Sequence, residues 1–359
     1  MKFTATSIAA LSLALTTTAI PNRAPRSENE KGALQHWPVE AAKALNQMIS
    51  KNANQSNYAV FDADNTSWRY DIEESSIPYL ENKGILSRET MDPSLQLIPF
   101  KDTETYKETL YSYYLRLCAM DSLICYPWAA QIYAGLTLRV VKEHIDTMLA
   151  ENENIPVIYW GEGDFLYLKY IDPAKVFTGQ VELFNELQRN GIDVWVVSAS
   201  NEEIVRFVMS DPKYGYNVKP ERVLGVSTMM RLPDGNLTTS RKQIQEGTYN
   251  QTANLDLQFG SYLWTPATWY AGKWAAVTTY IDAWKKPVLA AGDTPGSDTY
   301  MHFNVDIEKG GIHLWVNGTE EKMEKLQRLI DDAVKGQKAN NLPITADKNW
   351  VVVKPEDIA

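Results

Sequence analysis

The chain has 359 residues, of which 44% are hydrophobic, and its 35 basic and 45 acidic side chains give a net charge of −10. This length and apolar content allow a large folded core with a second domain, and they exclude wholesale disorder. The acidic balance argues against a nucleic-acid groove and a polybasic membrane surface. The negative charge could attract a cationic ligand, or the acidic side chains could simply form an ordinary solvated surface.

The N-terminus has the form of a secretory signal peptide. Lys2 is followed by an apolar run over residues 8–20 and by small residues up to Ala24, which is the order of a positive start, an apolar core and a small-residue exit. The run is shorter than the ~20 residues that cross a bilayer, and no later segment is long and apolar enough. We therefore assign residues 1–19 to a signal peptide, with an uncleaved helix as the alternative, and expect a secreted or periplasmic protein without a membrane anchor.

Export would place the two cysteines, Cys118 and Cys125, in an oxidising compartment, where a disulfide is the first expectation. In an unbroken helix their Cα atoms would lie roughly 10 Å apart, which is too far for a bridge. The pairing therefore requires a turn, which residues 120–122 could supply. Zinc is not expected with two thiols and four histidines. Four sequons, which accept glycans only in a eukaryotic secretory pathway, begin at Asn54, Asn236, Asn250 and Asn317.

Sequence periodicity predicts alternating strands and helices with one long helical insert. A helix is expected over 39–50 and a buried strand over 58–61. Residues 72 to about 172 have helical periodicity and lack short β-rich runs, with helices expected over 72–83, 103–118 and 131–150. The later elements are a helix ending at 189, a strand over 192–197, a helix from 201, a hairpin turn at 233–235, a helix from 272, strands over 287–291 and 311–316, and a helix over 320–335.

Short apolar runs of this kind suit strands that are buried on both faces of a parallel sheet. The sequence therefore predicts an α/β fold with a three-layer, Rossmann-like parallel sheet core. We expect residues 37–71 and 176–359 to form this catalytic core. Residues 72–175 are expected to form a mostly helical cap, inserted after the first strand.

Reactive side chains follow the predicted strands or open a predicted helix. Asp62 and Asp64 follow the first strand, Ser198 and Asp293 follow two later ones, and Lys273 opens a helix. In open α/β sheets the chemistry gathers beyond the carboxyl ends of the strands, so we expect these residues to converge. Each signal alone is weak, because a solvated turn or a surface lysine is common. Together and in this order they indicate an enzyme active site.

Phosphoryl transfer explains this combination of residue types. One carboxylate can attack phosphorus to form an aspartyl-phosphate, and a second can protonate the leaving oxygen and later deprotonate water. Carboxylates repel phosphate, so such a site needs Mg²⁺, which binds one or two carboxylates. Asp293 and Asp298 are candidates for holding the metal, and Lys273 can neutralise phosphate. Ser198 offers a hydroxyl near a helix start.

The motifs Asp62-Ala63-Asp64-Asn65-Thr66, Ser198, Lys273 and Gly292–Asp298 resemble those of the haloacid dehalogenase superfamily of phosphatases. Within it, residues 61–74 and 101–128 resemble most closely the exported bacterial members that act on phosphocholine. The resemblance runs from about Trp37 to the last strand. Ala63 and Ser200 depart from the usual pattern, but neither departure removes a reacting group.

The resemblance implies a role for each motif residue. Asp62 would be the nucleophile and Asp64 the general acid and base, while Ser198 and Lys273 would bind the phosphoryl group. It also implies a Mg²⁺ site made by Asp62, the backbone carbonyl of Asp64, Asp293 and, in a supporting place, Asp298.

A quaternary ammonium group has no hydrogen-bond donor and is held by aromatic faces and carboxylates. Glu73 and Glu74 stand where the predicted cap begins, and Tyr113 and Tyr114 lie on a predicted cap helix. We assign these four residues and Thr66 to substrate binding. The alternatives are core packing for the tyrosines and a charge pair at a helix N-terminus for the glutamates.

The sequence therefore predicts an exported, Mg²⁺-dependent phosphomonoesterase for small substrates with a quaternary ammonium group, without a nucleic-acid partner. One alternative is a broad-specificity acid phosphatase of the same mechanism. Another is a non-catalytic choline-binding protein, although binding alone would not need Asp62, Asp64, Lys273 and Asp293 together.

Overall fold

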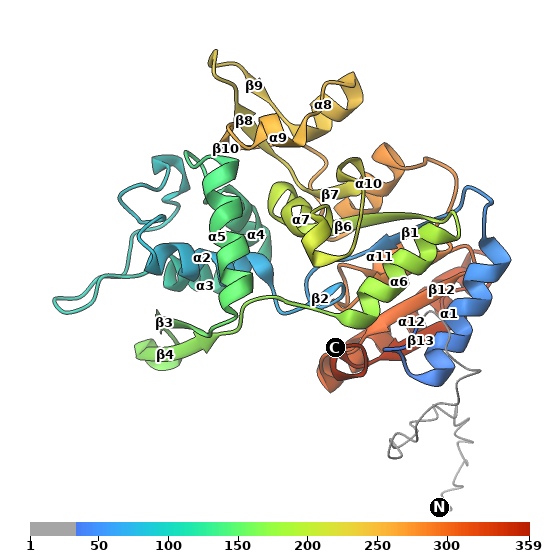
Figure 1. Cartoon of the computed structure of the whole chain (residues 1–359). Coiled ribbons are helices and arrows are strands. Elements are labelled where there is room, and N and C mark those ends of the chain that lie inside the picture. Colours follow the sequence, from blue (N-terminus) through green and yellow to red (C-terminus); the bar gives the residue numbers. More distant parts are fainter. Residues whose placement is uncertain (1–33) are drawn as a thin grey trace, which may run out of the picture. The chain divides into compact units, whose positions relative to one another are not determined.

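The computed structural model describes residues 34–359, so the predicted signal peptide lies outside the described residues. The main sheet has six parallel strands in the order β13-β12-β11-β1-β6-β7 (Figure 1). Their bounds are β1 Tyr58–Phe61, β6 Asp193–Asn201, β7 Val223–Val226, β11 Leu289–Gly292, β12 Ile312–Val316 and β13 Trp350–Val353. The parallel sheet core expected from the sequence is confirmed.

Alternate residues of each strand face opposite helical layers, which explains why the strands are mainly apolar. In β1, Ala59 and Phe61 pack in one apolar cluster, which includes residues of α1 and α6, whereas Tyr58 and Val60 pack in another with residues of α10 and α11. The bounds of the helices around the sheet are α1 Val39–Asn52, α6 Thr178–Arg189, α7 Glu202–Met209, α10 Ala271–Tyr280, α11 Thr299–His302 and α12 Glu320–Ala339. The result is a three-layer α/β/α arrangement.

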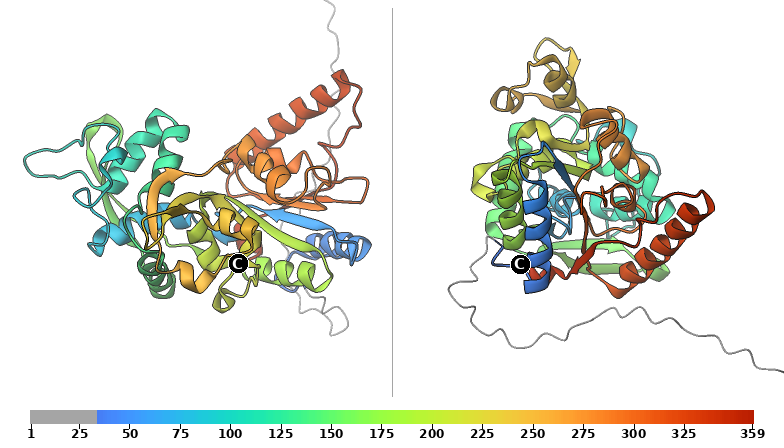
Figure 2. Two further views of the ribbon diagram at one scale, coloured as in Figure 1. Left: turned by 90° about the horizontal axis from the view of Figure 1, so that it is seen from above. Right: turned by 90° about the vertical axis from the view of Figure 1, so that its right-hand side faces the viewer.

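The C-terminal helix α12, the long red helix in Figure 2, packs on β12 through Leu326 and Ile330 against Trp315. Its apolar residues recur at helical spacing, while its remaining surface is mostly charged. Within residues 34–359, none of the helices is long and apolar enough to cross a membrane.

The segment between β1 and β6 leaves and rejoins the core through two short antiparallel strands, β2 Trp68–Arg69 and β5 Lys175–Val176. Between them lie α2 Ile72–Asn82, α3 Leu110–Met120, α4 Ser122–Gln131, α5 Leu138–Glu151 and a hairpin of β3 Ile155–Trp160 and β4 Leu166–Ile171. These elements pack together as a group (Figure 1). The insert is therefore mostly helical but ends in a hairpin.

A second, smaller insert follows β7 and consists of a three-stranded antiparallel sheet with two short helices. Its bounds are β8 Thr228–Arg231, β9 Leu237–Thr238, α8 Ser240–Glu246, α9 Gln251–Asn254 and β10 Gln258–Leu263. The predicted turn at 233–235 joins β8 to β9. The backbone N–H of Leu232 donates to the carbonyl of Asn236 across this turn at 2.8 Å.

Three local predictions for the insert were wrong. The helix expected from residue 103 begins only at Leu110, because the side chain of Thr109 caps it by accepting the N–H of Ser112. The helix expected over 131–150 begins only at Leu138, because the residues after α4 form a turn in which Gly135 has φ +91. The β3–β4 hairpin was missed because Ile158 and Leu168 keep its exposed face apolar, which hides the polar and apolar alternation of a strand.

The disulfide between Cys118 and Cys125 is present, with the Cα atoms 4.9 Å apart. The helix breaks at Asp121, which caps both α3 and α4. The expected pairing is thus confirmed, together with the turn that it requires.

Candidate active site

The carboxyl end of β1 turns sharply and presents Asp62. The N–H of Asp62 still pairs with Ala291 of β11, at 3.0 Å, and its carbonyl accepts the hydroxyl of Ser67 at 2.6 Å. The carbonyl of Ala63 then accepts the N–H groups of Thr66 and Ser67, which closes the turn. Asp62 is therefore held at the end of a rigid strand.

Lys273 joins Asp62 to the loop after β11. Its Nζ lies 2.6 Å from Oδ1 of Asp62 and 2.6 Å from Oδ1 of Asp298, and the lysine is 1% exposed. Although burial opposes both shifts, these carboxylates raise the pKa of Lys273 and the lysine lowers the pKa of Asp298. Burial, followed by the charge of Asp298, raises the pKa of Asp62 well above its usual value despite the lysine. A further cation would help to keep Asp62 ionised.

Asp298 orders the loop that carries Asp293. Its second oxygen accepts the N–H groups of Asp293 and Thr294, at 3.0 and 2.8 Å. Gly292 makes this approach possible, since a Cβ on Gly292 would lie 2.4 Å from the Cβ of Asp298. Asp293 itself pairs with Lys322 of α12, and its pKa rises to about 6, chiefly because it is buried.

The carboxylates of Asp62, Asp293 and Asp298 form a buried acidic group whose ligand atoms lie within 4.8 Å of one another. Carboxylate oxygens in such a cluster are the ligands that hard divalent cations prefer. The donor set therefore fits a metal ion such as Mg²⁺.

Asp64 is fixed by three donors. Its Oδ1 accepts the N–H of Ile72 at 2.8 Å and the indole N–H of Trp68 at 2.9 Å, and its Oδ2 accepts the hydroxyl of Ser200 at 2.7 Å. Burial nevertheless raises the pKa of Asp64. A raised pKa suits a group that must carry a proton before it can donate one.

A cavity of about 260 Å³ lies against these groups. Asp62, Asp64, Lys273 and Asp293 line it, together with residues of the insert. The insert contributes Asp71, Glu73, Glu74, Tyr114, Tyr126 and Ala129. The cavity is smaller than the roughly 300–1,000 Å³ pockets that hold drug-sized ligands, which favours a small molecule.

Glu73 and Glu74 occupy the first turn of α2. Glu73 is buried and accepts the N–H of Asn201 at 3.1 Å, and burial raises its pKa to about 8. Glu74 accepts the hydroxyl of Tyr111 at 2.7 Å. Both side chains are therefore directed by other groups of the protein as well as lining the cavity.

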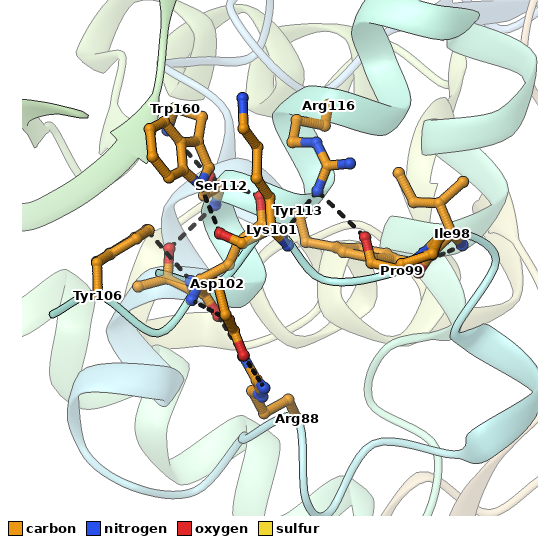
Figure 3. A network of polar contacts seen from close by, with 12 residues as sticks. Arg88, Ile98, Pro99, Lys101, Asp102, Tyr106, Ser112, Tyr113, Arg116 and Trp160 are labelled. Carbon is orange, nitrogen blue, oxygen red and sulfur yellow. Dashed lines mark hydrogen bonds and ion pairs between the residues drawn. The ribbon is translucent and has the colours of Figure 1, made fainter. Parts of the chain in front are cut away.

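The two adjacent tyrosines of α3 lie in different environments. Tyr114 lines the cavity, but Tyr113 does not: its ring packs on Phe100 and Trp128, and its hydroxyl donates to the carbonyl of Ile98 at 3.1 Å. Figure 3 shows Tyr113 within the polar network that holds residues 98–102 to α3 and β3 of the same insert. Its ring and hydroxyl are thus occupied by packing contacts away from the cavity lining, and its assignment to the substrate stays a prediction.

Ser198 and Thr66 are, like Asp298, buried without lining the cavity. The Oγ of Ser198 accepts the N–H of Ser200 at 3.1 Å. The carbonyl of Thr66 accepts the side-chain amide of Gln180 at 2.7 Å. Their assignments to the phosphoryl group and the substrate stay predictions.

The sequence analysis missed several lining or supporting residues, namely Asp71, Tyr126, Tyr270, Lys322 and Lys325. Asp71 and Tyr126 lie within the stretches that carry the family resemblance, so a signal for them existed. Tyr270 and the two lysines stand outside those motifs.

Comparison with known proteins decides the family. The chain is 55% identical over 326 residues to phosphorylcholine phosphatase of Pseudomonas aeruginosa, covering 90% of this chain and 93% of that protein. The chain belongs to the phosphorylcholine phosphatase family. It is therefore a phosphoric monoester hydrolase, and the expected likeness to a bacterial phosphorylcholine phosphatase is confirmed.

No family model matches the chain. Among solved structures, a protein of unknown function from Anaerococcus prevotii superposes with a TM-score of 0.56 at 17% identity, covering 82% of this chain and 90% of that one. This likeness concerns the fold alone.

Proposed function

We propose that this protein is a Mg²⁺-dependent phosphomonoesterase that hydrolyses phosphocholine-like substrates to choline and phosphate through an aspartyl-phosphate. The observation that carries the proposal is that one cavity is lined by both groups of residues. Asp62, Lys273 and Asp293 of the core line it together with carboxylates and tyrosines of the insert. The relative from Pseudomonas aeruginosa, named for phosphorylcholine, supports the same substrate.

The charge balance of the cavity supports a substrate with a positive group. Six lining residues are acidic, namely Asp62, Asp64, Asp71, Glu73, Glu74 and Asp293, whereas two are lysines, Lys273 and Lys325. Burial raises the pKa of Glu73 to about 8 and also raises those of Asp62 and Asp64, so these carboxyls ionise fully only when cations stand beside them. A metal ion beside the phosphate and a quaternary ammonium beside the glutamates would supply that positive charge. Tyr114 and Tyr126 offer ring faces to the same cation.

The chain's own residues can carry both chemical steps. An oxygen of Asp62 bonds to phosphorus while the bond from phosphorus to the choline oxygen breaks, and Asp64 gives its proton to that oxygen. Asp64 then takes a proton from water as the water oxygen attacks phosphorus, which releases phosphate and restores Asp62. Lys273 holds the phosphoryl charge and fixes Asp62.

The acidic group of Asp62, Asp293 and Asp298 is the proposed place for Mg²⁺, together with the backbone carbonyl of Asp64. Because Asp298 already accepts Lys273 and two backbone N–H groups, we assign it the supporting place. When bound, the metal would neutralise charge on the phosphoryl oxygens.

We further infer the predicted division of labour along the chain. Residues 37–71 and 176–359 would form the catalytic core, and residues 72–175 would form the cap that selects the alcohol part of the substrate. The lining residues of α2, α3 and α4 support this division. Export through a signal peptide at residues 1–19 remains a prediction.

The test is a comparison of kcat/KM for phosphocholine, phosphoethanolamine and p-nitrophenyl phosphate, each with Mg²⁺ and after EDTA treatment. We expect phosphocholine to be preferred and all activity to require the metal. Equal values for the three substrates would instead indicate a broad-specificity phosphatase. Binding of choline without any turnover would indicate a non-catalytic protein.

A further inference from the structure

Helix α4 of the insert meets the core through two side chains that contact one core residue. The hydroxyls of Ser122 and Tyr270 lie 2.6 Å apart, in a hydrogen bond. The rings of Tyr126 and Tyr270 stack, with centroids 6.4 Å apart and planes inclined by 21°. Since Ser122 and Tyr126 are four residues apart in one helix, they share a face. Both Tyr126 and Tyr270 line the cavity, so this contact closes part of its wall.

The position of Ser122 is fixed from the cap side. It is the first residue of α4 and lies within the short loop that the disulfide between Cys118 and Cys125 closes. The other end of α4 is tied to the core, where the side-chain amide of Asn201 donates to the carbonyl of Ala130 at 2.9 Å. The first turn of α4 is held to the core by the bond from Ser122 to Tyr270.

The core side of this contact leads directly to the phosphate-binding lysine. Tyr270 has φ +51 and ψ −129, a backbone conformation that a bulky residue rarely adopts. Its carbonyl accepts the N–H of Lys273 at 3.0 Å at the start of α10. The ammonium of Lys273 in turn contacts Asp62 and Asp298. Tyr270 therefore contacts the cap with its side chain and α10, the helix of Lys273, with its backbone.

We propose that the hydrogen bond between Ser122 and Tyr270 is a latch that holds α4 closed over the alcohol part of the substrate. Tyr270 is then a positioning residue that links this closure to Lys273 and limits the size of the accepted alcohol. The proposal rests on the proposed function, since it concerns how the same site selects its substrate. With the latch broken, the wall at Tyr126 moves more freely, so choline is held less tightly and bulkier alcohols gain access.

The first test uses Tyr270→Phe, Ser122→Ala and the double variant, with kcat and KM measured for phosphocholine and for 2-naphthyl phosphate. Each single variant should raise the KM for phosphocholine about 2–10-fold, the effect of losing one hydrogen bond, with a smaller change in kcat. Their kcat/KM for 2-naphthyl phosphate should stay level or rise. The double variant should lose no more than either single one, because the two hydroxyls make one bond.

Tyr262→Phe is the matched control, because its side chain lies in β10 and is 70% exposed. It should leave both substrates unaffected. Losses that multiply in the double variant, equal losses on both substrates, or wild-type values in the single variants would each overturn the latch.

A second readout does not depend on substrate identity. Hydrogen exchange of a peptide covering residues 119–130, without substrate, should be faster in Tyr270→Phe and Ser122→Ala than in the wild type and in Tyr262→Phe. Unchanged exchange would overturn the latch even if phosphocholine is the substrate. Conversely, faster exchange in an enzyme that fails to cleave phosphocholine would keep the latch and refute the proposed function.

Discussion

Asp293 contacts one cation and is proposed to bind a second. Its carboxylate pairs with Lys322, and it is also one of the three acids proposed to hold Mg²⁺. The lysine is 35% exposed at its side chain, so it can turn toward water when a metal takes its place. The affinity of the site for metal should therefore depend strongly on the charge of Asp293.

We expect Asp293→Asn to raise the Mg²⁺ concentration for half-maximal activity by at least about 10-fold, the lower end of the effect of losing a residue that merely supports a metal ligand. At saturating metal, KM for the substrate should change much less. Titration of activity with Mg²⁺ measures the first quantity, and titration with substrate at saturating Mg²⁺ measures the second. Asp332→Asn on the exposed face of α12 is the control. Full wild-type activity after exhaustive EDTA treatment would show that the metal assignment is wrong.

Tyr114 and Tyr113 allow a matched comparison of a cavity residue with a packing residue. Tyr114→Leu keeps much of the volume but removes the ring face, so kcat/KM for phosphocholine should fall roughly 2–30-fold, the value of one cation–π contact. Hydrolysis of p-nitrophenyl phosphate, which lacks the cation, should fall less. Tyr113→Phe should leave the ratio of the two substrates unchanged. A loss of equal size on both substrates in Tyr114→Leu would mean that Tyr114 only shapes the cap.

The choice between these two tyrosines shows where sequence reasoning stops. Adjacent residues of a helix point about 100° apart, so a pair of tyrosines predicts that one faces inward but not which one. The contact of Lys322 with Asp293 could not be predicted either, since a lysine on an amphipathic helix normally faces water. Tyr270 depends on a left-handed backbone turn that no periodic pattern reveals. Asp62 and Asp293 were predictable because each directly follows a buried strand.

At the scale of elements, the loop between β11 and α11 depends on a residue without a side chain. Alanine at Gly292 would place its Cβ 2.4 Å from that of Asp298, so the loop would have to move. We expect Gly292→Ala to lower kcat on the order of 100-fold, as displacements of about 1 Å in an active site can do. Gly318→Ala is the control, since nothing lies within 4 Å of its added Cβ. Wild-type kcat in Gly292→Ala would contradict the role given to this loop.

The elements that the sequence predicted best are the strands whose only requirement is to be buried on both faces of the sheet. β1, β6, β11 and β12 are buried on both sides, so short apolar runs identify them, although His313 interrupts the run in β12. The helices of the insert must satisfy several packing contacts at once, because they pack on each other, on the core and around the cavity. Its boundaries therefore depend on local caps such as Thr109 and on breaks such as Gly135, which periodicity does not locate.

At the scale of the whole molecule, two buried histidines should make stability depend on pH. His302 of α11 and His313 of β12 lie with their rings 6.0 Å apart. Burial lowers the pKa of His302 to about 4 and that of His313 to about 3. The unfolded chain takes up these protons near pH 6.5 and the folded chain only near these lower values, so protonation favours unfolding as the pH falls below about 6.5.

Between pH 7.5 and 5, His302 alone should cost about 2 kcal/mol of unfolding free energy, at about 1.4 kcal/mol per pH unit below 6.5. Buried carboxyls with raised pKa values, such as Glu73, act in the opposite direction. The test is therefore a difference: urea unfolding of the wild type and of His302→Gln at both pH values. The variant should lose about 2 kcal/mol less than the wild type on acidification. An identical pH dependence would contradict the neutral, buried state of His302.

The central claim is that Asp62 attacks the phosphorus of the substrate, and turnover of phosphocholine by Asp62→Asn tests it most directly. An amide cannot form the acyl-phosphate, so kcat should fall to background while circular dichroism and the unfolding midpoint stay close to the wild type. Mass spectrometry must exclude deamidation back to aspartate, and Asp332→Asn serves as the control. Normal kcat in a verified Asp62→Asn sample would contradict the mechanism.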